Sequence, residues 1–380
     1  MDTAVRYTGR SGPAVYSWDR GVENLDITPT MFGEVTTHYG AIADKLRSYG
    51  LEADIKPYGS FGTGTVVRPL KSPKGDGPGS YYDLDVLAEC RRDGIGWMTP
   101  RALRSEVDGI LRGDSTYAQM IEDPSSQCLT IAYAESDGRS AFKLDLSSGV
   151  SAPRPDAGIS FGSESVRLAW IDPDEWKGSN PVGLCDWFNA QNERFLLYGR
   201  TERRKAILDR YKRLYSSVEQ IPDQVDRSAL QRAVQVVKRS RDVYFSLASS
   251  EDDAPSSCVL MVLVAQAAEI LPSDADIVTI VEAFASACAS MSDAVPVVLN
   301  PVYPENLVEG WSEQRIATFH HWAGNLSENL AVDMNDKARR NAAIDGLLGG
   351  GTSSRLEREG LLTAAPPSIT IGRPVKPWRG

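Results

Sequence analysis

The sequence Tyr-Asp-Leu-Asp-Val-Leu occupies residues 82–87 and places Asp83 and Asp85 two positions apart. The alternation of polar and apolar residues predicts a strand, and side chains two apart on a strand point to the same side. Leu84 and Val86 would therefore enter the core while both carboxylates face outward together. Like charges held this close repel each other and need compensation. A divalent cation such as Mg²⁺ suits the pair, since it binds carboxylate oxygens together with substrate phosphates.

Two further motifs accompany the Asp-x-Asp pair. One directly follows a predicted strand, and the other lies on a predicted strand. Gly59 and Ser60 follow the predicted strand at 53–58, where exposed backbone amides and a hydroxyl can bind phosphate oxygens. The predicted strand at 140–146 directs its apolar residues to the core and Asp145 to the opposite side, beside the first pair if the strands are neighbours. An Asp-x-Asp pair alone is common in turns. Together the three acids could hold two metal ions for a phosphoryl displacement.

The rest of the chain predicts a sheet lobe followed by a helical lobe. Strands are predicted at residues 53–58, 64–68, 82–89, 128–134 and 140–146, and helices at 30–49, 99–111, 181–197, 201–217, 227–246, 257–271, 276–291 and 311–333. We therefore expect an α+β, bilobal protein whose mixed sheet carries helices and is followed by a C-terminal helical domain. The expected divisions are 1–165 for the N-terminal helix and catalytic core, 166–345 for the helical domain and 346–380 for a flexible tail.

The composition is that of a soluble globular protein, with 42% hydrophobic and 24% charged residues. The 41 basic and 51 acidic side chains give a net charge of −10, which disfavours broad binding to duplex nucleic acid. The longest apolar stretch, 259–271, contains Gln266 and Glu269 and is too short to cross a membrane. The start of the chain lacks the features of a secretion signal. The 5 cysteines are scattered singly, so we expect reduced thiols and a cytoplasmic protein.

The motifs resemble those of the nucleotidyltransferase superfamily that includes polymerase beta and poly(A) polymerase. The closer resemblance is to the bacterial cGAS/DncV-like nucleotidyltransferases (CD-NTases) of CBASS anti-phage signalling. Three later segments carry it: Ser179-Asn180-Pro181 with Trp187-Phe188, the Lys-Arg-x-Arg-Asp motif within residues 236–245, and Asn300-Pro301 with Glu305-Asn306-Leu307 and Trp311. The resemblance covers about residues 30–325.

This resemblance implies a polymerase-beta-like core and synthesis of a cyclic di- or trinucleotide from ATP, GTP or other ribonucleoside triphosphates. Pyrophosphate would be released, and Mg²⁺, with Mn²⁺ as an alternative, would be the cofactor. The implied catalytic and metal-binding residues are Asp83, Asp85 and Asp145, and the implied nucleotide-binding residues are Gly59, Ser60, Lys238, Ser256 and Ser257. The Ser256–Ser257 pair could equally be an ordinary helix N-cap.

Two departures from the family pattern concern the core motif and the later helix. More residues separate Ser60 from Asp83 than the superfamily usually has, and the excess at 71–79 reads as a surface loop. Ser240 stands where the helix motif often has His, whereas Lys238 is retained. The Cys/His insertion of the vertebrate DNA sensor is absent, and we expect no activation by DNA.

Peripheral features leave alternatives open. The basic run at 200–213 is interpreted as a solvated helix face rather than a contact for nucleotide or an activating ligand. The C-terminal Gly380 either ends an ordinary tail or is conjugated to targets by CBASS accessory proteins.

Function also has alternatives at this stage. The chain could transfer a nucleotide to another acceptor, such as an RNA 3′ end, a small molecule or a protein, or it could be an inactive nucleotide-binding scaffold. The acidic composition disfavours the RNA acceptor, and the presence of all three carboxylates disfavours the scaffold.

Overall fold

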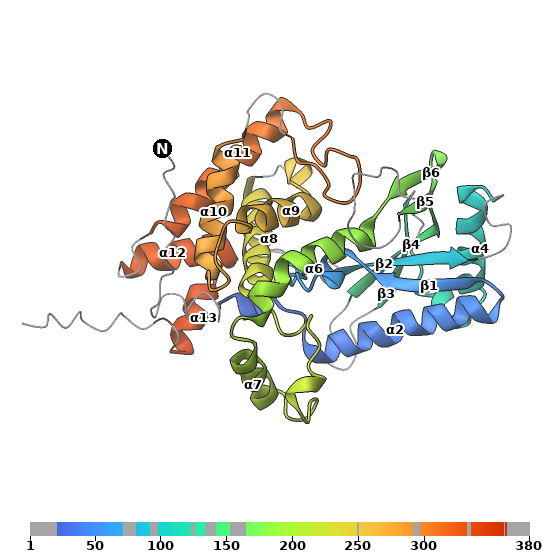
Figure 1. Cartoon of the computed structure of the whole chain (residues 1–380), viewed down its shortest axis with the longest axis horizontal. Coiled ribbons are helices and arrows are strands. Elements are labelled where there is room, and N and C mark those ends of the chain that lie inside the picture. The colour runs from blue at the N-terminus through green and yellow to red at the C-terminus, as the bar shows by residue number, and fades with distance from the viewer. Residues whose placement is uncertain are drawn as a thin grey trace, which may run out of the picture.

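The computed structural model describes residues 21–70, 81–91, 98–122, 125, 127–133, 142–152, 165–248, 251–291, 297–332, 336–360 and 362. Figure 1 shows a sheet-containing lobe at one end of the molecule and a bundle of helices at the other. Each lobe has its own buried hydrophobic cluster. The predicted bilobal α+β fold is thereby confirmed. The predicted surface loop at 71–79 and the C-terminal Gly380 lie outside the described residues.

The sheet brings the predicted motif strands together. Its strands are β1 (Glu52–Pro57), β2 (Tyr82–Arg91), β3 (Leu129–Tyr133), β4 (Phe142–Ser151), β5 (Val166–Ile171) and β6 (Asp174–Ser179). Their order is β1-β2-β4-β5-β6, with β3 also pairing with β4. The β2–β4 pair is parallel, whereas the other pairs are antiparallel. This parallel pair places the Asp-x-Asp strand directly beside the strand that carries Asp145.

Helices α2 (Pro29–Ser48) and α4 (Pro100–Arg112) flank the sheet, with the short α3 (Gly59–Gly62) and α5 (Ser115–Ala118) at its connections. Each long helix begins at a Thr-Pro pair, where proline fits the first helical position. The Thr28 hydroxyl accepts from the Met31 amide at 3.2 Å, and that of Thr99 accepts from the Ala102 amide at 3.1 Å. Thr99 is thus the N-cap of α4, within the helix predicted at 99–111.

The second lobe is built from helices of the later chain. They are α6 (Pro181–Leu197), α7 (Arg200–Arg210), α8 (Ala229–Ala248), α9 (Ser257–Ala268), α10 (Ile277–Ala289), α11 (Glu313–Leu330), α12 (Lys337–Leu348) and α13 (Thr352–Arg358), with short 3₁₀ turns η1 (Glu23–Leu25), η3 (Val218–Gln220) and η4 (Glu251–Asp253). Most follow the predicted helices closely, but α7 ends at Arg210, earlier than predicted. Figure 1 shows α7 projecting away from both lobes.

Three sequence predictions of secondary structure are wrong. Residues 166–179, predicted to belong to the helical part, form β5 and β6; the Asp174–Ser179 strand is a polar edge without a clear apolar alternation. Thr352–Arg358, predicted to lie in a flexible tail, is a helix whose Leu356 is 1% exposed. Residues 64–68 form no strand, because their carbonyl groups bind side chains instead.

Candidate active site

The three predicted carboxylates lie on adjacent strands. In the parallel β2–β4 register, Asp85 pairs with Asp145, and Asp83 lies two residues earlier on β2. The intervening Leu84 and the following Val86 are 0% exposed, so the carboxylates share the opposite face. The geometry predicted for the acids is therefore confirmed. Thr130 on β3 donates from its hydroxyl to Asp145 Oδ1 at 2.6 Å and orients this carboxylate.

Burial, together with repulsion between the acids, alters the protonation of Asp83 and Asp85. Burial and then the neighbouring Asp145 raise the pKa of Asp85 to about 6, while Lys238 opposes the shift. Burial and Asp145 also raise the pKa of Asp83. Raised carboxyl pKa values with like-charged neighbours show that this site accumulates negative charge without full compensation.

The donor chemistry of these acids fits a divalent cation. Hard cations such as Mg²⁺ bind carboxylate oxygens and retain positions for water and phosphate. A cation here would relieve the repulsion that raises the pKa of Asp83 and Asp85. Among the described residues, no group of three His, Cys, Asp or Glu side chains is already arranged to hold a metal ion.

Gly59 brings the backbone of α3 against the acids. Its φ of +59° lies in the left-handed region, and a Cβ there would lie 2.3 Å from Asp85 Oδ2. The amide of the preceding Tyr58 donates to the Asp85 carbonyl at 3.0 Å. Only glycine permits this approach. The Gly-Ser pair thus lies at the start of α3, next to the carboxylates, as the sequence indicates.

A cleft of about 1230 Å³ lies between the two lobes. Six of the predicted site residues line it: Gly59, Ser60, Asp83 and Asp85 from the sheet lobe, and Lys238 and Ser257 from the helical lobe. Two others, Asp145 and Ser256, are not among its lining residues. The structure therefore brings together most of the residues that the sequence singled out.

Lys238 is the cationic residue of the helical lobe that the sequence analysis named as nucleotide-binding, and it lines the cleft. It is 6% exposed, and its Nζ donates to the Thr65 carbonyl at 3.1 Å. Burial and then the neighbouring Arg241 lower the pKa of Lys238 to about 8, whereas Asp242 and Asp85 oppose this. In this structure Lys238 holds the backbone beside the cleft as well as facing it.

The two serines at the start of α9 have different roles. Ser256 is the N-cap, and its hydroxyl accepts from the Val259 amide at 3.3 Å. Ser257 lines the cleft and accepts from Arg241 Nη1 at 3.2 Å. The N-cap interpretation therefore holds for Ser256, and Ser257 alone faces the cleft. Ser240 accepts from Trp322 Nε1 at 3.2 Å within the helical core, where the motif often has His.

Several cleft residues were given no role from the sequence. Arg241 and Asn180 belong to segments that carry the family resemblance, and that resemblance was a usable signal. Glu305 also lines the cleft and accepts from Asn300 Nδ2 at 2.6 Å. Asp345 lines it from α12, although nothing in the local sequence pointed to a site. Its carboxylate binds Ser353 of α13.

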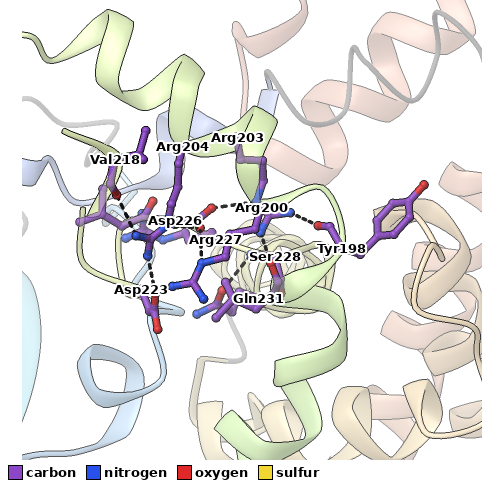
Figure 2. Close-up of polar contacts among 12 residues, drawn as sticks. Tyr198, Arg200, Arg203, Arg204, Val218, Asp223, Asp226, Arg227, Ser228 and Gln231 are labelled. Carbon is purple, nitrogen blue, oxygen red and sulfur yellow. Dashed lines mark hydrogen bonds and ion pairs between the residues drawn. The ribbon is translucent and has the colours of Figure 1, made fainter. Parts of the chain in front are cut away.

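Arginines of the basic run at 200–213 form ion pairs with Asp223 and Asp226 instead of facing solvent alone. Arg203 Nε and Arg204 Nε donate to the two oxygens of Asp226 at 2.8 and 2.9 Å, and Asp226 is 0% exposed. Arg200 and Arg204 also bind Asp223, as Figure 2 shows. The prediction of a solvated face is wrong for Arg204, which is 9% exposed.

Comparisons with known proteins agree with this architecture. No protein family model matches the chain. A curated c-di-GMP synthase from Roseivirga ehrenbergii is 26% identical over 309 residues, which cover 77% of this chain and 71% of the relative. The CD-NTase CdnG from Bradyrhizobium diazoefficiens, solved in complex with GTP, superposes with a TM-score of 0.68 at 19% identity and covers 92% of this chain and 99% of CdnG. The chain has the CD-NTase fold.

Other CD-NTases superpose over most of the chain. CdnC from E. coli MS115-1 with ATP gives a TM-score of 0.58 at 13% identity, over 88% of this chain and 98% of CdnC. GTP-bound DncV from Vibrio cholerae gives 0.50 at 18% identity, over 90% of this chain and 80% of DncV. Searching the described residues, we find no helix with the length and apolar character needed to cross a membrane.

Proposed function

We propose that this protein joins ribonucleoside triphosphates into a cyclic oligonucleotide and releases pyrophosphate. The observation that carries the proposal is the pairing of Asp85 with Asp145 beside the Gly59 turn, where Asp83 and Asp85 line a cleft between two lobes with the CD-NTase fold. The related c-di-GMP synthase and the GTP complex of CdnG support guanine nucleotides as substrates. ATP stays a second candidate, because CdnC and DncV have been crystallised with ATP or an analogue.

The chain's own residues suit this reaction. The amides and hydroxyl of Gly59 and Ser60 would bind phosphate oxygens of the donor triphosphate. Asp83, Asp85 and Asp145 would hold Mg²⁺ or Mn²⁺. Such a cation, when bound, lowers the pKa of the attacking ribose hydroxyl and neutralises charge on the triphosphate.

The transfer itself breaks one bond and forms another. The ribose oxygen of one nucleotide bonds to the α-phosphorus of the next, the hydroxyl proton passes to solvent water, and pyrophosphate leaves with the electron pair of the broken P–O bond. Lys238 would balance the negative charge from the helical lobe. A second transfer within the linear product would close the ring. The cleft of about 1230 Å³ is larger than a drug-sized ligand needs, and therefore has room for more than one nucleotide.

The fold also suggests a biological setting. CD-NTases act in anti-phage signalling, and we propose the same role here, with accessory proteins acting on the C-terminal tail that ends at Gly380. Loss of phage protection in cells carrying an Asp85→Asn variant would support this role, whereas full protection would count against it.

The biochemical test uses the purified full chain. We would incubate it with each ribonucleoside triphosphate and with all four together, in Mg²⁺ and in Mn²⁺, then treat the mixture with phosphatase and analyse it by chromatography. A phosphatase-resistant, guanine-containing product with matching pyrophosphate release is expected. A nucleotide found on RNA, a small molecule or the protein would favour another acceptor, and triphosphate binding without turnover would favour an inactive scaffold.

A further inference from the structure

The segment 63–68 follows Gly59 and Ser60 closely, yet the described residues include no strand that pairs with it. Its carbonyl groups instead accept hydrogen bonds from side chains of α8 and of the residues just before it. The bonds run from Gln231 Nε2 to the Thr63 carbonyl (2.9 Å), Arg227 Nε to Gly64 (3.0 Å), Lys238 Nζ to Thr65 (3.1 Å), Gln235 Nε2 to Val66 (2.8 Å), and Arg239 to Arg68. We call these donors the α8 clamp.

Three of the clamp donors lie on one face of α8. Residues 231, 235 and 238 recur at intervals of three or four, which stacks their side chains along one side of the helix, and Arg227 extends the row just before the helix begins. Gln231 is 3% exposed and Gln235 is 0% exposed. Buried amides of this kind must be hydrogen-bonded, and loss of their carbonyl partners would leave them unsatisfied. The clamp therefore fixes segment 63–68 against the helical lobe.

The clamped segment is in turn bonded to the Gly-Ser pair. The Gly59 carbonyl accepts from the Thr63 amide at 3.2 Å and from its hydroxyl at 2.9 Å. The Ser60 carbonyl accepts from the Thr65 amide at 2.8 Å. Gly59 and Ser60, which would bind phosphate, are therefore each hydrogen-bonded directly to a residue that the clamp holds.

Gly64 permits the close approach of Gln231. Its φ is +68°, and a Cβ at this position would lie 2.6 Å from Gln231 Nε2. Both the backbone conformation and the space require glycine here. The contact between loop and helix is thus built into the sequence of both partners.

Gln235 connects the clamp to the carboxylate strand. Its Nε2 also donates to Asp26 Oδ1 at 2.9 Å, and the Asp26 carbonyl accepts from the Tyr82 hydroxyl at 3.4 Å. Tyr82 directly precedes Asp83 on β2. The same helix face therefore reaches both the Gly-Ser turn and the start of the Asp-x-Asp strand.

We propose that Gln231 and Gln235 are positioning residues for the nucleotide triphosphate, acting through segment 63–68 on Gly59 and Ser60. The inference rests on the proposed function, because it requires Gly59 and Ser60 to bind the triphosphate. Loosening the clamp would move Gly59 and Ser60, the residues proposed to bind the phosphates. Its signature is a loss of affinity that depends on the number of phosphates.

The test compares GTP with GMP, and ATP with AMP, by calorimetric titration of the full chain with Mg²⁺. Gln231→Glu keeps the shape of the side chain but removes the amide donor and places a carboxylate against the Thr63 carbonyl. We expect the variant to bind the triphosphate about tenfold more weakly or worse and the monophosphate within about twofold of the unmodified protein. Gln314→Glu, the same substitution at an exposed position of α11 whose amide donates to Thr318 at 3.1 Å, is the control and should bind both as the unmodified protein does.

Gln231→Glu that binds the triphosphate as tightly as the unmodified protein would overturn the proposal. An equal loss for both nucleotides at an unchanged melting temperature would overturn it too, since Gln231 would then support the part of the site that both nucleotides share rather than the triphosphate contacts. If Gln231→Glu does not fold, Gln231→Met tests the same donor without adding a charge. Failure of the unmodified chain to bind any triphosphate would instead contradict the proposed function, and the clamp proposal with it.

Discussion

The backbone of Gly59 passes so close to Asp85 that no side chain fits between them. A Cβ on Gly59 would meet the carboxylate oxygen at 2.3 Å, whereas one on Gly50, also at positive φ, would meet no atom within 4 Å. Both glycines have a positive φ, but only at Gly59 would an added Cβ collide with another atom. They therefore form a matched pair of positions.

Substituting both glycines separates backbone strain from displacement of the carboxylate. We expect Gly50→Ala to lower the free energy of unfolding by about 1 kcal/mol, the strain of a left-handed alanine, and to leave product formation unchanged. Gly59→Ala should carry the same strain and also reduce product formation by at least about tenfold. Urea unfolding and the chromatographic assay measure the two effects. Equal activity of the two variants would contradict the assigned role of Gly59.

The protonation of Asp85 predicts how stability depends on pH. Burial and Asp145 raise its pKa from 3.8 to about 6, so the folded protein keeps a proton that the unfolded chain releases. The stability from this site is present at low pH and is lost as the pH rises through about 4 to 6. Asp85→Asn removes the buried charge and should stabilise the metal-free protein at neutral pH by up to about 3 kcal/mol.

The melting temperatures of both proteins from about pH 4 to pH 8, without divalent cations, test this. The advantage of Asp85→Asn should shrink steadily as the pH falls and vanish near the low end. Glu309→Gln, at an exposed carboxylate outside the lining of the cleft, is the control and should show little difference at any pH. A constant difference for Asp85→Asn would mean that its charge is not destabilising.

For individual residues, the sequence predicts those site positions that follow from local periodicity and spacing. Asp83 and Asp85 could be placed on one face because strand alternation is local. Asp345 could not be predicted, because it reaches the cleft only through the packing of α12 against α8. Ser256 shows the limit of a short motif, since a serine that precedes a helix is equally an N-cap.

Among the elements, segment 63–68 shows how side chains can replace a strand partner. Residues 64–68 were predicted as a strand from their short alternating run, but the α8 clamp binds carbonyl groups of the segment. Local sequence cannot distinguish these cases, because the donors lie about 170 residues later. The helices α6 and α10, by contrast, were predicted nearly to their ends from their apolar pattern and caps.

The segment between α6 and α8, which contains α7 and η3, is stabilised by ion pairs to Asp226. This carboxylate is 0% exposed and pairs with the half-buried Arg203 and the buried Arg204, so replacing it removes the negative charge that faces both guanidinium groups (Figure 2). We expect Asp226→Asn to lower the free energy of unfolding by about 3 kcal/mol. Asp209→Asn, which breaks only an exposed pair with Lys212 at 3.4 Å, should change it little. Urea denaturation compares the two, and equal stabilities would show that the buried cluster contributes nothing.

Across the whole molecule, the cleft is formed by the docking of two lobes with separate cores. The sequence predicts both lobes, because their hydrophobic patterns differ. It does not predict how they meet, because that depends on contacts such as the clamp and on β5 and β6, which extend the sheet beyond the predicted division. Asp83 and Asp85 of the sheet lobe and Lys238 of the helical lobe line one cleft only as a result of this docking.

The central claim is that the carboxylates of β2 and β4 catalyse the joining of nucleotides. The most direct measurement is the yield of phosphatase-resistant product from labelled ribonucleoside triphosphates, made side by side by the unmodified protein and by Asp85→Asn. The account predicts product from the former and at least about a thousandfold less from the latter, although the variant is expected to be the more stable protein. Product formed by Asp85→Asn at the rate of the unmodified protein would contradict it.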